Sequence, residues 1–146
     1  SSGVSSPNKD SSAEKETIRD GKSKGKILVV EDDKFLRELL VRKLFSEGFT
    51  IESAIDSRST FEILSNWKPE IILLDLILPG EDGFSILEKI KKDNKLADIQ
   101  VVILSNLGQQ EDVDRAMALG AMDFMVKANF TLDEIIEKVT KALGLN

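Results

Sequence analysis

The chain has 146 residues, of which 41% are hydrophobic and 32% charged, and its formal net charge is −6. This is the size and composition of one globular domain with its own core. The negative charge argues against nucleic acid as a direct partner, because phosphate binding needs a cationic surface. The sequence contains no Cys and no His, which excludes disulfides, thiolate or imidazole metal sites and imidazole-based triads. Any bound metal should therefore be a hard cation held by oxygen ligands.

Residues 1–25 differ in composition from the rest of the chain. They contain seven Ser, three Gly and one Pro but only three aliphatic residues, so they cannot bury an apolar face. We predict that this segment is disordered, with a tag remnant at its start, and that residues 26–146 form the folded domain. No run of about 18 apolar residues occurs that could span a membrane, and the N-terminus lacks the apolar core of a signal peptide. We expect a cytoplasmic protein with no membrane contact.

From residue 26 onward, apolar runs of strand length alternate with segments of helical periodicity. The expected strands are 26–30, 49–55, 71–75, 99–105 and 122–126. The expected helices are 33–48, 57–67, 83–93, 110–120 and 131–144. Strands that are apolar on both faces and joined by helices indicate a parallel sheet covered on two sides. The predicted fold class is therefore α/β, a three-layer doubly wound (βα)5 sandwich, whose ligands bind at the carboxyl ends of the strands.

Polar side chains follow four of these strands. They are Glu31, Asp32 and Asp33, then Asp75, then Ser105 and Asn106, and finally Lys127. Because parallel strands end at one edge of the sheet, we expect these residues to converge there. Carboxylates beside a hydroxyl and a Lys can hold a hard cation together with an anion. A simpler role as helix N-cap is preferred for Asp33, whereas a carboxylate ending a buried strand is costly and favours a functional role for Asp75.

Four segments in this order resemble the receiver domain of two-component response regulators. They are "KILVVEDD" (26–33), "PEIILLDLILPGEDG" (69–83), "VVILSN" (101–106) and "GAMDFMVKA" (120–128). The resemblance covers nearly all of the predicted domain. It implies a flavodoxin-like fold with a five-stranded parallel sheet in the order 2-1-3-4-5.

The resemblance also implies roles for the residues at the strand ends. Asp75 matches the phosphoacceptor, Ser105 the hydroxyl residue that bonds the phosphoryl group and Lys127 the lysine that pairs with it. The metal, Mg²⁺ or Mn²⁺, would be held by Glu31, Asp32, Asp75 and the backbone carbonyl of Ile77. A carboxylate nucleophile would depend on in-line positioning and on the charge of the cation and Lys127 rather than on a base.

The implied partner is a sensor histidine kinase or a histidine phosphotransfer protein, which would supply the donor imidazole that this chain lacks. Phosphorylation would draw Ser105 toward the new anion and open space for Phe124, the matching aromatic switch residue. The output surface would be the face of the fourth helix, fifth strand and fifth helix, through which a homodimer could also form. No enzymatic turnover is expected beyond self-phosphorylation from small donors and slow self-dephosphorylation.

The sequence departs from the family pattern at three positions. Ala128 follows Lys127 where the family commonly has Pro in a cis bond, which puts the position of Lys127 in question. Asn106 replaces a small residue beside Ser105, and Phe124 lacks the hydroxyl of a Tyr.

Three other functions stay open from the sequence. The first is a receiver-like interaction module that is not phosphorylated, which Asn106 and Ala128 would allow. The second is a phosphohydrolase with an aspartyl nucleophile of the haloacid dehalogenase type, although such enzymes need a second Asp where this chain has Ile77. A flavodoxin-like FMN binder is the weakest alternative, because the loop after the first strand is acidic rather than rich in hydroxyl residues and Gly.

Overall fold

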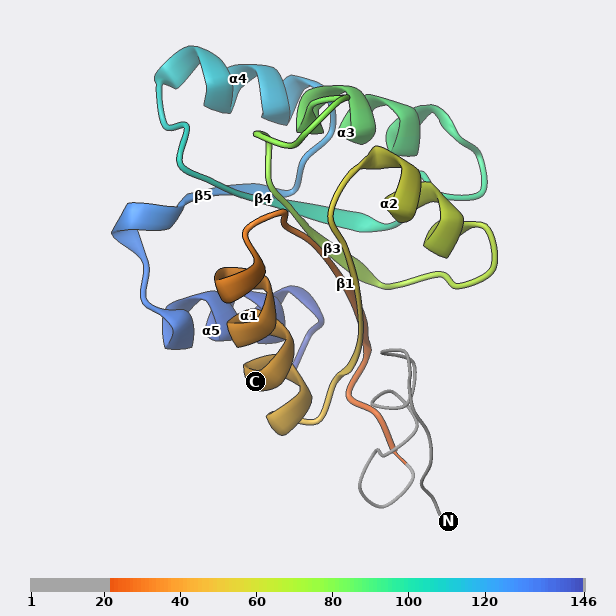
Figure 1. Cartoon of the computed structure of the whole chain (residues 1–146), viewed down its shortest axis with the longest axis vertical. Helices are drawn as coiled ribbons and strands as arrows, with labels where there is room; N and C mark the ends of the chain where they lie inside the picture. Colours follow the sequence, from red (N-terminus) through yellow and green to blue (C-terminus); the bar gives the residue numbers. More distant parts are fainter. Residues whose placement is uncertain (1–21, 146) are drawn as a thin grey trace.

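The structure, a computed structural model, describes residues 22–145. Within this range five parallel strands alternate with five α-helices (Figure 1). The strands are β1 (Lys26–Val30), β2 (Thr50–Ala54), β3 (Ile71–Leu74), β4 (Gln100–Ser105) and β5 (Asp123–Val126). The helices are α1 (Lys34–Ser46), α2 (Ser57–Leu64), α3 (Gly83–Lys92), α4 (Gln110–Ala118) and α5 (Leu132–Ala142). The predicted (βα)5 succession is confirmed.

The sheet has the order β2-β1-β3-β4-β5, as expected. Each neighbouring pair is parallel, with Val30 opposite Ala54 on one side of β1 and Leu74 on the other. The chain winds outward from β1 in both directions, so the order reverses between β1 and β3. In such sheets the loops on either side of the reversal separate and leave a crevice at the carboxyl ends of the strands.

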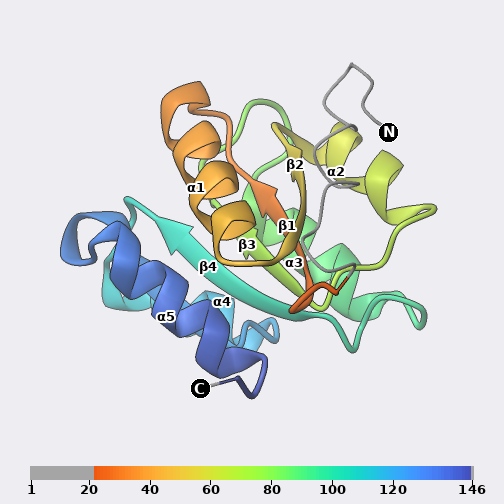
Figure 2. The ribbon, with the colours of Figure 1, turned by 90° about the horizontal axis from the view of Figure 1, so that it is seen from below.

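Two apolar layers cover the sheet. Helices α1 and α5 lie against one face, and α2, α3 and α4 lie against the other (Figures 1 and 2). Residues of β1 alternate between the two layers, Leu28 facing the layer of α2–α4 and Ile27 the layer of α1 and α5. Burial on both faces explains why the strands read as continuous apolar runs, since an alternating pattern arises only when one face is wet.

Several element ends follow from local chemistry. The side chain of Asp33 caps α1 by accepting a hydrogen bond from the Leu36 N–H at 3.1 Å, which confirms the N-cap expected there. Thr131 and Glu134 form the capping box predicted for α5. The structure ends α2 at Leu64, three residues before the predicted end at 67, and ends α4 at Ala118, two before 120. A 3-10 turn, η3 (Lys127–Asn129), which the sequence pattern did not predict, follows β5 directly.

The last residues of the predicted N-terminal segment contact the sheet. The Lys24 N–H donates to the Gly48 carbonyl at 2.9 Å, and the Thr50 N–H donates to the Gly25 carbonyl at 2.8 Å. Residues 1–21, on which the prediction of disorder mainly falls, lie outside the described residues. In the described part of the chain, no helix has the length and apolar character needed to cross a membrane.

Candidate functional site

Three carboxylates meet at the carboxyl edge of the sheet. Glu31 directly follows β1 and Asp75 directly follows β3, and the Asp75 N–H still donates to the Val30 carbonyl at 3.1 Å, so the two residues lie side by side. Glu31, Asp32 and Asp75 each offer an oxygen within 4.8 Å of the others. Glu31 and Asp75 are only 2% and 4% exposed, whereas Asp32 is open to solvent. Convergent carboxylate oxygens open to solvent on one side fit a hard divalent cation.

Lys127 reaches this group from the far side of β4. Its Nζ lies 2.7 Å from Glu31 Oε1 and 2.9 Å from Asp75 Oδ2, and its side chain is 15% exposed. The peptide bonds of the described residues are trans, so Lys127 makes both contacts with Ala128 following it through a trans bond. Lys127 therefore lies at the edge where it was expected, and the departure at Ala128 does not move it away.

The ionisation of the cluster follows from its burial. Burial raises the pKa of the Glu31 carboxyl, and the negative charge of Asp75 adds to this, although hydrogen bonds from Lys127 and the Asp33 N–H act against it. Burial by itself would lower the pKa of Lys127, but its hydrogen bonds to Glu31 and Asp75 outweigh this and raise it. Lys127 therefore stays charged at neutral pH, while Glu31 ionises less readily than a solvated Glu.

Ser105 and Phe124 lie on the same face of the sheet. Ser105 ends β4 and is fully buried, and its Oγ accepts a hydrogen bond from the Leu107 N–H at 3.3 Å. Ser105 pairs with Val126 and Ile103 with Phe124, so the alternation of side chains puts Phe124 diagonally beside Ser105. The ring of Phe124 is half-buried against the α2–α4 layer. Asn106 is exposed at the mouth of the site.

The loop after Asp75 is held close to the strand that carries it. The Ile77 N–H donates to Asp75 Oδ1 at 3.2 Å, while the Ile77 side chain is 53% exposed. A Cβ on Gly83 would lie 2.3 Å from the Asp75 carbonyl oxygen, so only Gly permits α3 to begin here. Gly80, at the tip of the same loop, has φ +76 and nothing within 4 Å of its Cβ position.

Two features near this edge were not predicted from the sequence. Arg37 donates from Nη1 to the carbonyls of Glu31 and Asp32 at 2.9 and 3.3 Å. Glu81, in the loop before α3, accepts hydrogen bonds from the hydroxyls of Ser57 and Ser85 and pairs with Lys89 at 2.8 Å. Neither arrangement was predicted, because one depends on the position of two backbone carbonyls and the other on side chains that the fold brings together.

The chain is similar to known proteins over most of its length. The sequence profile of the response regulator receiver domain matches residues 27–140. The phosphate regulon transcriptional regulatory protein PhoB of Escherichia coli is 35% identical over 114 residues, which cover 78% of this chain and 49% of that protein. The chain spans about half the length of such curated relatives.

Two solved structures illustrate the likeness in three dimensions. The signal receiver domain of a signal transduction histidine kinase from Syntrophus aciditrophicus has a TM-score of 0.75 at 30% identity, with 82% of this chain and 90% of that one covered. The Mn²⁺-bound form of response regulator Rcp1 has a TM-score of 0.70 at 26% identity, with 80% and 92% covered.

Proposed function

We propose that Asp75 is the phosphoacceptor of this chain. The proposal starts from the family, because the chain belongs to the response regulator receiver domain family. The observation that carries this assignment is the buried contact of 2.9 Å between Asp75 Oδ2 and Lys127 Nζ. An ammonium held against one carboxylate oxygen is ready to pair with the anion that would form on that carboxylate. Asp75, Ser105 and Lys127 also stand at the sequence positions where the family has its functional residues, which supports the same assignment.

The chemistry needs no general base. An ionised oxygen of Asp75 forms the new O–P bond, and the bond from phosphorus to the donor's leaving group breaks with its electron pair going to that group. The donor is a phosphohistidine of a sensor histidine kinase or phosphotransfer protein, or a small acyl phosphate. Lys127 contributes its charge, and the Ser105 hydroxyl can donate to a phosphoryl oxygen after turning from Leu107.

The acidic group also supports a divalent cation site. Glu31, Asp32 and Asp75, together with the backbone carbonyl of Ile77, would hold Mg²⁺ or Mn²⁺ through oxygen atoms, as such cations prefer. The bound cation would neutralise charge on the phosphoryl oxygens during transfer. In this structure Asp75 Oδ2 accepts a hydrogen bond from Lys127 and Oδ1 accepts one from the Ile77 N–H.

We assign the signalling unit to residues 26–146 and its output to the α4-β5-α5 face, where Phe124 lies half-buried. Ser105 and Phe124 share the face of the sheet that α2, α3 and α4 cover, so a shift of Ser105 toward a phosphoryl group would free space beside the ring. A homodimer through this face, a cytoplasmic setting and the lack of direct nucleic-acid binding belong to the same proposal. The net charge of −6 supports the last point.

An enzyme that turns over external phosphate esters is not proposed. Ile77 stands where an aspartyl-nucleophile hydrolase needs its second Asp, and its exposed side chain offers no proton. A receiver-like module that is never phosphorylated is the main alternative. A wild-type chain that gains no phosphoryl group in the assay below would support it.

The test is to incubate the chain with Mg²⁺ and acetyl phosphate and to measure the intact mass. We expect one acid-labile phosphoryl group on the wild-type chain and none on Asp75→Asn. Glu62→Gln, which removes an exposed carboxylate of α2, is the matched control and should be labelled like the wild type. Equal labelling of Asp75→Asn would overturn the assignment.

A further inference from the structure

Arg37, one turn into α1, donates hydrogen bonds to the backbone of the acidic loop, residues 31–33, between β1 and α1. Its Nη1 donates to the Glu31 carbonyl at 2.9 Å and to the Asp32 carbonyl at 3.3 Å. The half-buried side chain of Arg37 also lines a groove of about 470 Å³ between α1 and β2. Arg37 therefore ties the helix to the two residues that supply two of the three convergent carboxylates.

Of the three carboxylates, Asp32 depends most on its backbone. Lys127 holds the side chains of Glu31 and Asp75. For the Asp32 side chain, the described residues provide no hydrogen bond or ion pair. The direction of this carboxylate is then set by the main chain at Asp32, whose carbonyl is held by Arg37.

We propose that Arg37 is a positioning residue for the divalent cation, acting through the backbone of Glu31 and Asp32. The inference rests on the proposed function for the identity of the ion. A guanidinium presents several donors in a fixed plane, so one end of it can hold two carbonyls, and its charge strengthens both bonds. Groups that orient metal ligands in this way typically change metal affinity by about 10- to 100-fold when they are removed.

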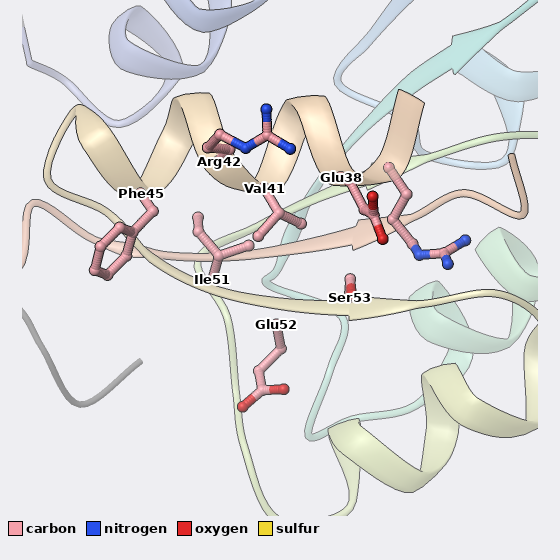
Figure 3. Close-up of a pocket in the computed structure, with 8 residues that line it drawn as sticks. Glu38, Val41, Arg42, Phe45, Ile51, Glu52 and Ser53 are labelled. Carbon is pink, nitrogen blue, oxygen red and sulfur yellow. The ribbon is translucent and has the colours of Figure 1, made fainter. Parts of the chain in front are cut away.

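The sign of the effect separates positioning from simple electrostatics. As a nearby positive charge, Arg37 repels a cation, so its loss would tighten binding if charge were its only influence. If Arg37 instead positions the metal ligands, its loss weakens binding of the cation. Arg42, on the same helix and in the same groove, makes no bond to the acidic loop and serves as the matched control for charge (Figure 3).

The experiment uses the whole chain as wild type, Arg37→Gln and Arg42→Gln. Titration calorimetry gives the Kd for Mg²⁺, and acetyl phosphate labelling gives the Mg²⁺ concentration at half-maximal rate. Arg37→Gln should raise both by about tenfold while keeping most of the rate at saturating Mg²⁺. Arg42→Gln should leave the Kd unchanged or lower it. A Kd for Arg37→Gln equal to or below that of Arg42→Gln would overturn the inference.

A replacement variant and two further outcomes with the wild-type chain keep the test decisive. If circular dichroism shows that Arg37→Gln does not fold, Arg37→Lys takes its place, because it keeps the charge and a donor but loses the planar fork; a weaker Kd for Mg²⁺ is again expected, and an unchanged one contradicts the inference. A wild-type chain that binds Mg²⁺ but gains no phosphoryl group contradicts the proposed function alone. A wild-type chain that is labelled and binds no Mg²⁺ contradicts the positioning role.

Discussion

A buried cluster and a surface cluster in this domain are built from the same groups, carboxylates and a lysine, with opposite balance. In the buried cluster one ammonium, on Lys127, faces three carboxylates at the sheet edge. In the surface cluster a single carboxylate, on Glu81, is met by three donors, from Ser57, Ser85 and Lys89. The buried cluster therefore has one cation for three carboxylates, and the surface cluster has one cation and two hydroxyl donors for a single carboxylate.

Ionisation follows this balance in both places. Burial raises the pKa of Glu31, because one shared ammonium does not replace the lost water. The hydrogen bonds from Lys89, Ser57 and Ser85 lower the pKa of Glu81 to about 2. The surface cluster is therefore complete and joins α2 to α3, whereas the buried cluster is short of positive charge, as a cation site requires.

Removing the lysine of each cluster should show the largest contrast. Lys127→Met leaves buried carboxylates without their partner and should lower the free energy of unfolding by about 3 kcal/mol. Lys89→Met removes an exposed partner and should cost at most about 1 kcal/mol. Urea unfolding of both variants in EDTA provides the measurement. Equal losses would show that the two clusters do not differ as described.

Divalent cations should act on the buried cluster alone. A Mg²⁺ concentration of about 100 times the Kd should stabilise the wild-type chain by about 2.7 kcal/mol, and EDTA should reverse this. The gain should shrink sharply in Asp32→Asn, which loses a ligand oxygen, and stay intact in Glu81→Gln. Thermal unfolding with and without Mg²⁺ measures this stabilisation. A stabilisation that survives in Asp32→Asn would place the ion elsewhere.

The smallest effect belongs to the pH dependence of the surface cluster. The folded-state pKa of Glu81 is lowered from 4.5 to about 2, so its contribution to stability is present above 4.5 and is lost as the pH falls toward 2. Solvent screening limits this contribution to about 1 kcal/mol. The difference in unfolding free energy between wild type and Glu81→Gln should therefore shrink from about pH 6 to about pH 3 in urea titrations. A difference that is constant with pH would mean that Glu81 acts through packing.

The sequence predicted the buried cluster better than the surface one for a physical reason. Strand runs are visible in a sequence, and parallel strands bring their ends to one edge, so Glu31, Asp75 and Lys127 could be placed together from the sequence alone. The chain positions of Ser57 and Glu81 carry no such signal, because their contact depends on how far the loop before α3 reaches toward α2.

Burial and backbone contacts could not be predicted from the sequence either. Nothing in the helical pattern of α1 distinguishes Arg37 from Arg42, yet only Arg37 reaches the carbonyls of the acidic loop. The early end of α2 at Leu64 and the 3-10 turn after β5 depend on packing that propensity does not encode. Element types and the capped N-terminal ends of α1 and α5 were therefore predictable, whereas the C-terminal ends of α2 and α4 were not.

The two glycines of the loop after Asp75 have a practical consequence for engineering the domain. Gly83 admits no side chain, because α3 begins with its backbone against the Asp75 carbonyl. Three residues earlier, the tip at Gly80 faces open space, and its left-handed backbone is one that Asn adopts more readily than other residues. A peptide epitope or reporter group could therefore be inserted at the tip within a few residues of the Asp75 carboxylate, whereas even a methyl group at position 83 would displace a helix.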